Sequence, residues 1–349
     1  MQKRKLGSSD IFVSPITIGC WAFGGGEYWG EQSQSDVNAV VSMAMDAGIN
    51  TFDTAEVYNN GLSEEALGIA LKGRRTSAVI IDKFAPNRAY YKEVLNSCDN
   101  SLKRLKTDYI DLYMLHWPIN ERSINHFSGN ENKLVSPPTI EEAMSALNEL
   151  IRLGKIRAAG ISNFGVLQTK EALACGTPIA ANQLSYNILS RAIEAEIAPF
   201  MLKSGISILG SMTLQQGLLT GKYLSADDVP AHQAHSRHFA QERGAGSRHY
   251  TEGAEKEIFT ALDELRQMAR DLNTSLASLA ISWAVNGGVV TSALVGMRNR
   301  MQLNENLAAL NLELTKAQIA EINRISRSVL EKLGNSPDYY ESPENSRTY

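Results

Sequence analysis

The feature that most constrains this chain is a repeat in which short apolar runs alternate with amphipathic stretches, at intervals of very roughly thirty to forty residues. Eight apolar runs have the length of a strand: Ile16–Gly19, Ile49–Asp53, Ala78–Lys83, Tyr109–His116, Ala158–Asn163, Ala180–Gln183, Ile206–Ser211 and Ser292–Gly296. The expected helices are Ser35–Ala47, Ser63–Leu71, Tyr90–Leu105, Thr139–Leu153, Val166–Cys175, Ile193–Ser204, Glu255–Val285 with a break near Asn273, and Gln318–Ser328. Because βα crossovers are right-handed, eight in succession close into a barrel. The sequence therefore predicts an α/β fold, a (β/α)8 TIM barrel, with a doubly wound parallel sheet as the alternative.

Helix start signals agree with this order of elements. Ser35 or Asp36 is expected to cap the first helix. Ser63 is followed by Glu64 and Glu65, which places acidic side chains at the positive end of the second helix.

Several segments do not fit the repeat. Lys3–Leu6 and Phe12–Ser14 are expected to pair as a short N-terminal hairpin across the floor of the barrel. Asn120–Pro138 and Ser225–Gly253 are too long for ordinary connections, and such segments are typical of lids and binding loops. Residues 1–330 are thus predicted to be a single barrel domain, and Glu331–Tyr349 a polar C-terminal tail.

Composition excludes several classes of protein. Thirty-four basic and 38 acidic side chains give a net charge of −4, which offers no electrostatic attraction for a nucleic acid or an anionic membrane. No stretch approaches the ~18 apolar residues of a spanning helix, and no apolar core follows the basic N-terminus. Cys20, Cys98 and Cys175 form no CxxC pair, as expected in a reducing compartment. The expected location is the cytoplasm.

Polar side chains end several of the predicted strands. They are Asp53, Lys83, His116, Asn163 and Gln183. In a barrel the C-terminal strand ends meet on one face, where active sites lie, so an acid, an amine and an imidazole are expected around one basin. This set suits proton transfer. The alternative is that each residue simply ends a strand and meets water.

Motifs at these positions resemble the aldo-keto reductases. They are residues 53–58 (DTAEVY), Lys83, 115–118 (LHWP), 160–164 (GISNF), 216–223 (QGLLTGKY) and 305–307 (ENL), in the order of that family. The resemblance runs from about Lys5 to about Ser328. It implies an oxidoreductase that reversibly transfers hydride between NADPH, or NADH, and a small aldehyde, ketone or sugar.

The resemblance assigns catalysis to Asp53, Tyr58, Lys83 and His116. Tyr58 would protonate the carbonyl oxygen, and a neighbouring Lys83 cation should lower the phenol pKa from its usual value near 10. Asp53 would hold Lys83 in place, and His116 would orient the carbonyl. Substrate contacts are expected from Trp21, Tyr58, His116 and Trp117.

The same resemblance implies a cofactor site across the barrel mouth. Ser162, Asn163 and Gln183 would bind the nicotinamide carboxamide, and Arg298 the 2′-phosphate, which favours NADPH over NADH. The other cofactor contacts are expected from Gly19, Cys20, Trp21, Ser211, Leu214, Gln216, Gly217, Leu218, Gly221, Lys222, Gly296, Gln302, Glu305 and Asn306. The alternative for Arg298 is a solvated arginine at a helix start.

One position departs from the family pattern. Ser211 stands at the end of the seventh strand, where many members carry an aromatic residue that stacks on the nicotinamide. Losing that ring forfeits a contact of about 1 kcal/mol and leaves space for a bulkier polar substrate.

Further residues bear on the substrate. Phe23, Tyr28 and Trp29 follow Trp21 in a loop at the mouth, and the group could line a pocket for a sugar or an aromatic carbonyl compound. The His- and Arg-rich segment Ser225–Gly253 could recognise an anionic substrate or be a solvated loop.

Two other functions remain open at this stage. A metal-dependent barrel hydrolase or isomerase needs several ligands at strand ends, whereas only His116 of the six histidines ends a strand, so no metal is expected. A cofactor-binding regulatory subunit like the potassium-channel auxiliary proteins of the family would keep the same barrel and the same four residues.

Overall fold

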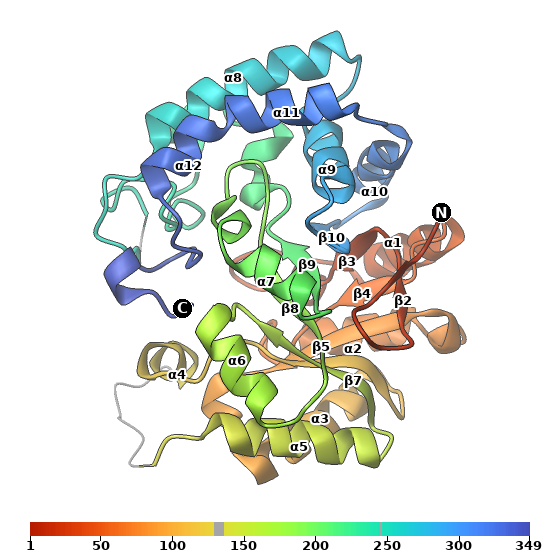
Figure 1. The fold of residues 1–349 in the computed structure, drawn as a ribbon. Helices are drawn as coiled ribbons and strands as arrows, with labels where there is room; N and C mark the ends of the chain where they lie inside the picture. Colours follow the sequence, from red (N-terminus) through yellow and green to blue (C-terminus); the bar gives the residue numbers. More distant parts are fainter. Residues whose placement is uncertain (129–135, 245) are drawn as a thin grey trace.

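A computed structural model describes residues 1–128, 136–244 and 246–349 of the chain. Eight parallel strands form a closed barrel in the order β10-β3-β4-β5-β6-β7-β8-β9 (Figure 1). Their bounds are β3 Ile16–Gly19, β4 Thr51–Asp53, β5 Val79–Phe84, β6 Ile110–Leu115, β7 Ile156–Ser162, β8 Ile179–Ser185, β9 Ser207–Ser211 and β10 Ser292–Gly296. The predicted TIM barrel is confirmed, and the doubly wound sheet is excluded because the last strand pairs with the first, at Ala293 and Ile16.

Helices cover the outside of this barrel (Figure 1). Their bounds are α1 Gln34–Asp46, α2 Leu62–Ala70, α3 Tyr91–Leu105, α4 Glu121–Ser128, α5 Ile140–Arg152, α6 Val166–Ala174, α7 Ile197–Lys203, α8 Glu255–Asp271, α9 Leu276–Asn286, α10 Arg300–Ala308, α11 Lys316–Ile325 and α12 Arg327–Leu333. The apolar faces of helices and strands share one large buried core between the two layers. The predicted break near Asn273 is confirmed, since this residue adopts a left-handed conformation between α8 and α9.

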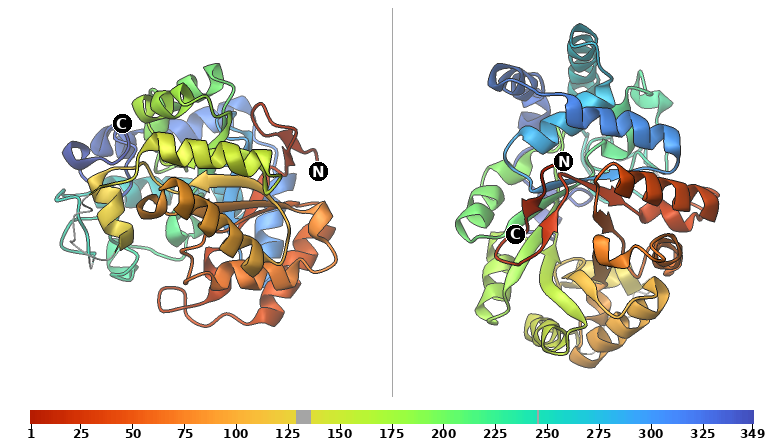
Figure 2. Two further views of the ribbon diagram at one scale, coloured as in Figure 1. Left: turned by 90° about the horizontal axis from the view of Figure 1, so that it is seen from below. Right: turned by 90° about the vertical axis from the view of Figure 1, so that its right-hand side faces the viewer.

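The N-terminal hairpin closes one end of the barrel. Strands β1 (Arg4–Lys5) and β2 (Phe12–Val13) pair antiparallel, as predicted. Side chains of the hairpin, such as Leu6, pack in a second core with inward-facing strand residues, among them Leu112 and Met114. In the right-hand view of Figure 2 the hairpin, in red, crosses the end of the barrel. The functional site is therefore restricted to the opposite end.

Some helix boundaries differ from the prediction. The first helix is capped by Ser33, whose hydroxyl accepts from the amide of Asp36, so Ser35 and Asp36 lie inside the helix rather than at its cap. The acidic first turn of α2 is confirmed at Glu64 and Glu65, although its cap is Gly61.

Three helices were not expected: α4, α10 and α12, the last of which lies mostly beyond the predicted helix end at Ser328. Helix α4 lies in a segment predicted as a long loop, of which residues 129–135 are outside the described residues. It has only eight residues, most of them polar, and only Ser123 and Ile124 are buried, so the segment has the composition of a loop. Helix α10 has no clear apolar face, with Leu303 and Asn306 as its buried residues, and it starts after the Asn299 cap.

The last residues of the chain return to the open end of the barrel. After α12 they pass beside α4 and α6, where the C-terminus lies in Figure 1. The Gln168 amide of α6 donates to the Arg347 carbonyl at 2.8 Å, and its oxygen accepts from the Tyr349 amide at 3.1 Å. Gly165 permits this approach, because a Cβ there would lie 2.2 Å from the Tyr349 oxygen. The C-terminal segment is thus fastened to the mouth of the barrel.

Candidate active site

A cavity of about 1600 Å³ opens at the carboxyl ends of the barrel strands. Asp53, His116, Asn163 and Gln183, from four different strand ends, all line it. Lys83 is fully buried and does not line the cavity itself, but it contacts Asp53 and Tyr58, which do. The strand-end residues that the sequence analysis placed around one basin therefore do meet there.

The Lys83 ammonium is the centre of the polar network in this cavity. Its Nζ lies 2.8 Å from Asp53 Oδ1, 2.8 Å from the Thr54 carbonyl oxygen and 3.4 Å from Tyr58 Oη. The Gln183 amide donates to the other Asp53 oxygen at 2.7 Å. Both carboxylate oxygens are therefore satisfied, so the ammonium is held in one position.

Burial and charge act in opposite directions on the Tyr58 phenol. Burial, with a smaller effect from Asp53, raises the pKa of Tyr58 to about 12, and the neighbouring Lys83 ammonium opposes this rise. The expected lowering by Lys83 is present, but burial outweighs it, so the net shift is opposite to the expected one. The phenol is consequently protonated at neutral pH and available as a proton donor.

His116 faces the same phenol in its neutral form. Its ring centroid lies 5.6 Å from that of Tyr58, in an edge-on arrangement. Burial, the Lys83 cation and His126 lower the pKa of His116 well below its usual value. Within the described part of the chain its Nδ1 has no hydrogen-bond partner. A neutral imidazole with a free nitrogen can donate a hydrogen bond to a carbonyl oxygen without delivering a full charge.

Amide and hydroxyl groups gather beside these residues at the ends of β7 and β8. Asn163 Nδ2 donates to the His116 carbonyl at 3.1 Å and to Ser162 Oγ at 3.1 Å. The Ser162 hydroxyl donates to the Gln183 carbonyl at 3.2 Å. Asn163 has a φ of 62°, a conformation that asparagine tolerates better than most residues. These groups offer the planar donors and acceptors that a carboxamide needs.

The loop after β9 has an unusual backbone. Met212, Gln215, Gln216 and Gly217 all have positive φ, from 48° to 102°. The side-chain nitrogen and oxygen of Gln216 are both buried and have no partner among the described residues. An unpartnered buried amide at a cavity wall fits a polar ligand that supplies the missing hydrogen bonds.

At the far end of the cavity, Arg298 is tied to the loop after β3. Its Nε donates to Gln32 Oε1 at 3.0 Å and its Nη2 to the Glu31 carbonyl at 2.6 Å. In return, Gln32 Nε2 donates to the Arg298 carbonyl at 2.9 Å. Sequence reasoning missed Gln32, because 266 positions separate it from Arg298.

Comparison with known proteins identifies the family. The model of the aldo/keto reductase family matches residues 15–327. The chain belongs to the aldo/keto reductase family. It is 30% identical over 346 residues to the aldo-keto reductase YhdN of Bacillus subtilis, covering 95% of each chain. It is 31% identical over 349 residues to the NADH-specific methylglyoxal reductase of Escherichia coli, covering 94% of this chain and 99% of the relative. The glycerol dehydrogenase AKR11B4 of Gluconobacter oxydans superposes with a TM-score of 0.73 at 27% identity, over 96% of this chain and 97% of the other.

Most residues that the family resemblance had assigned to the cofactor or the substrate line the cavity. These are Gly19, Trp21, Tyr58, His116, Trp117, Ser162, Asn163, Gln183, Ser211, Leu214, Gln216, Gly217, Lys222, Gly296, Arg298, Gln302, Glu305 and Asn306. Three of the residues expected to contact the cofactor are not in the lining. Cys20 and Leu218 point into the core, and Gly221 lies at the outer end of its loop.

Other lining residues had been assigned loosely or not at all. Tyr28 and Trp29 do line the cavity, whereas Phe23 is buried away from it. Sequence reasoning missed Met212, His126, Phe127, Tyr340 and Arg347. No local pattern could have found the last two, since only the path of the C-terminal segment brings them to the mouth.

The described ranges contain neither a metal-holding cluster nor a membrane-spanning helix. Across residues 1–128, 136–244 and 246–349, no group of three or more His, Cys, Asp and Glu side chains is placed to hold a metal ion. No helix in those ranges is long and apolar enough to cross a membrane.

Proposed function

We propose that this family member is an NAD(P)H-dependent reductase that reversibly reduces a small aldehyde or ketone, with Tyr58 as the general acid. The observation that carries the proposal is the Lys83 ammonium, 3.4 Å from the Tyr58 hydroxyl and anchored by Asp53 at 2.8 Å, at the wall of the cavity. A buried phenol beside a fixed cation is suited to hold a proton and then stabilise the phenolate that remains.

A nicotinamide cofactor bound here supplies or accepts the hydride. Ser162, Asn163 and Gln183 would hold its carboxamide, and Gln216, Gly217 and Lys222 its phosphates. The chain itself handles the proton. His116 orients the carbonyl oxygen, Tyr58 donates a proton to it, and Lys83 stabilises the resulting phenolate. In the oxidative direction the same phenolate takes the proton back.

The experiment that tests this function is an assay of a panel of aldehydes, ketones and oxidised sugars with NADPH and with NADH. We expect measurable turnover with several aldehydes. Cofactor binding without any turnover would contradict the proposal and favour a regulatory subunit.

The unpaired state of Cys20, Cys98 and Cys175 is consistent with our proposal that the enzyme acts in the reducing cytoplasm.

We further propose that Arg298 makes NADPH the preferred cofactor. Its guanidinium lines the adenosine end of the cavity, where a 2′-phosphate would pair with it. The NADH-specific relative from Escherichia coli shows that family membership alone does not decide this preference. Arg298→Met is expected to raise the KM for NADPH about tenfold, the effect of one charge-assisted hydrogen bond, and to leave the KM for NADH nearly unchanged.

Arg300→Met is the matched control, because Arg300 is exposed and does not line the cavity. Equal changes in both Michaelis constants for Arg298→Met would mean that Arg298 only supports the loop through Gln32. A larger rise in the KM for NADPH with Arg300→Met than with Arg298→Met would assign the phosphate contact to Arg300.

Ser211 offers a test of how the nicotinamide is packed. It ends the seventh barrel strand and lines the cavity, so no aromatic ring stands at this position. Ser211→Tyr is expected to restore a stacking contact of about 1 kcal/mol and lower the cofactor Kd several-fold, while raising the KM of bulky substrates. Fluorescence titration and steady-state kinetics measure the two effects. Unchanged values of both would show that another side chain already fills the space.

A further inference from the structure

Two arginines from distant parts of the chain line the substrate end of the cavity. Arg248 lies in the long connection between β9 and α8, and Arg347 belongs to the C-terminal segment. The carboxylates that pair with them, Glu341 and Asp338, do not line the cavity. Each ion pair therefore presents its cationic end to the interior of the cavity and its anionic end to the protein.

Arg347 is held rigidly. Its Nε and Nη2 each donate to an oxygen of Asp338 at 2.9 Å, and both side chains are almost completely buried. The guanidinium carbon lies 3.7 Å above the Trp117 ring. No described residue accepts a hydrogen bond from its remaining nitrogen, Nη1. The planar clamp on Asp338 leaves one guanidinium nitrogen for a ligand.

Arg248 lies close to the same place and is more open to solvent. Its Nε is 2.8 Å from Glu341 Oε1, and its Nη1 donates to His126 Nδ1 at 3.0 Å. Since Nδ1 accepts this bond, His126 carries its proton on Nε2 and is a second neutral donor. Burial, with the charges of Arg248 and Arg347, lowers the pKa of His126 to about 4. The positive charges of both arginines therefore act on the same side chain, His126, which lines the cavity.

This group of donors lies next to the catalytic residues. Trp117, under the Arg347 guanidinium, directly follows His116 in the chain. The His116 and Phe127 rings are 5.5 Å apart, and the Phe127 and His126 rings 5.1 Å. A short molecule can therefore place one end at Tyr58 and His116 and the other at the two guanidinium groups.

We propose that Arg248 and Arg347 bind a carboxylate on the substrate, so that the preferred substrates are aldehydes or ketones that carry a negatively charged group. This inference rests on the proposed reductase function. Each arginine is already paired with one carboxylate, so the two ion pairs carry no net charge and offer hydrogen-bond donors rather than excess positive charge, which suits a monoanion better than a phosphate dianion. Glu56, one of the carboxylates that line the cavity, accepts from the Ala85 amide at 2.9 Å and lies 3.9 Å from Arg88, so its charge is partly offset.

The test compares 4-carboxybenzaldehyde with 4-carbamoylbenzaldehyde, which have nearly the same shape and differ in charge. We expect kcat/KM to favour the carboxylate at least about tenfold, the effect of one charge-assisted hydrogen bond. The preference should decrease as salt is added, because the Arg248 side chain is partly exposed. Calorimetric titration of the same two compounds provides a readout that does not need turnover.

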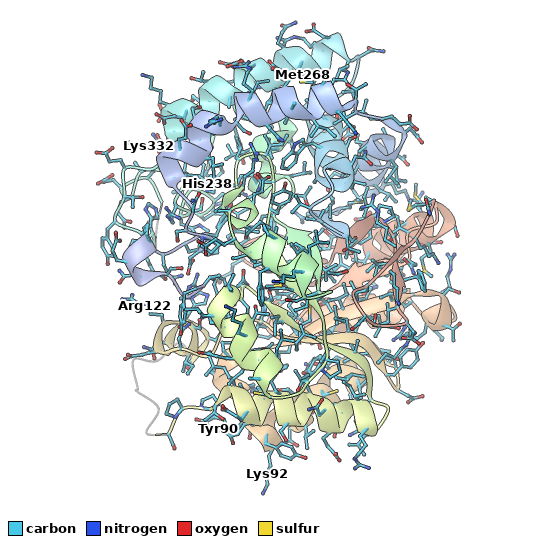
Figure 3. All side chains as sticks on the ribbon, viewed as in Figure 1. Tyr90, Lys92, Arg122, His238, Met268 and Lys332 are labelled. Atoms are coloured by element: carbon cyan, nitrogen blue, oxygen red, sulfur yellow. The ribbon has the colours of Figure 1, made fainter. Side chains whose placement is uncertain are left out.

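A double variant and a single variant separate the arginine from its ion-pair partner, and only the double variant keeps the buried charge balanced. Arg248→Met with Glu341→Gln removes the cation together with its buried partner, and should abolish most of the preference. Glu341→Gln alone frees Arg248 and should increase it. Arg122→Met is the control, since Arg122, labelled in Figure 3, donates to Asn345 of the same segment at 2.6 Å. Arg122 does not line the cavity.

The outcomes separate this inference from the proposed function. Turnover of both aldehydes at equal kcat/KM, with equal affinities, would overturn the carboxylate site and leave the reductase function standing. No turnover of either compound, with tighter binding of the carboxylate, would support the site and overturn the function. A preference that survives in the double variant would overturn the role of Arg248.

Discussion

Replacing Tyr58 by phenylalanine is expected to lower kcat/KM for carbonyl reduction by on the order of 10³-fold, within the range for loss of a general acid. The phenylalanine keeps the ring contacts with Trp21 and His116, at centroid distances of 5.8 Å and 5.6 Å, and removes only the hydroxyl. Cofactor affinity should therefore change little. The measurements are steady-state kinetics and a titration of NADPH fluorescence on the same preparation.

Tyr28→Phe is the matched control for this prediction. Tyr28 also lines the cavity and stacks on Trp21, 5.2 Å between ring centroids, but its hydroxyl has no partner among the described residues. Removing that hydroxyl should leave kcat/KM within about threefold of the native value, because the Tyr28 hydroxyl has no hydrogen bond to Lys83 or His116. Full activity of Tyr58→Phe, or an equal loss in both variants, would contradict the assignment of the acid to Tyr58.

The barrel and the candidate active-site basin were predictable because their signals are local. Strand runs such as 79–84 begin with consecutive apolar residues, here 79–81, and are buried throughout, and parallel strands bring their carboxyl ends to one side of a barrel. Asp53 and His116 stand at or directly after such ends. The position of a residue at a strand end therefore indicates which side chains it meets.

The remaining parts of the cavity depend on contacts between distant segments. Gln32 meets Arg298 across 266 positions, and Arg347 reaches Trp117 only because Gln168 and Gly165 hold the end of the chain. No period or motif encodes such contacts. The direction of the Tyr58 pKa shift could not be predicted for the same reason. The sequence indicates the neighbouring Lys83, which lowers this pKa, but it does not give the extent of burial, which raises the pKa by more.

Lys83→Met is expected to give the largest combined effect on stability and activity. It removes the cation from a buried pair in which Nζ lies 2.8 Å from Asp53 Oδ1, and leaves a buried carboxylate whose neighbour is the Gln183 amide. Breaking such a pair costs about 3–5 kcal/mol of unfolding free energy. The Tyr58 phenol also loses the charge that lowers its pKa, so kcat should fall. Alcohol oxidation requires the phenolate, and its pH profile should therefore move to higher pH.

The double variant Lys83→Met with Asp53→Asn separates the two effects. With both charges gone, no unpaired carboxylate remains buried, and most of the lost stability in thermal or urea unfolding should return. Activity should stay low, because no cation faces Tyr58 in either variant. If the double variant regained native kcat, the cation would have no part in proton transfer. If it stayed as unstable as the single variant, the loss would come from packing around the lysine side chain rather than from the isolated charge of Asp53.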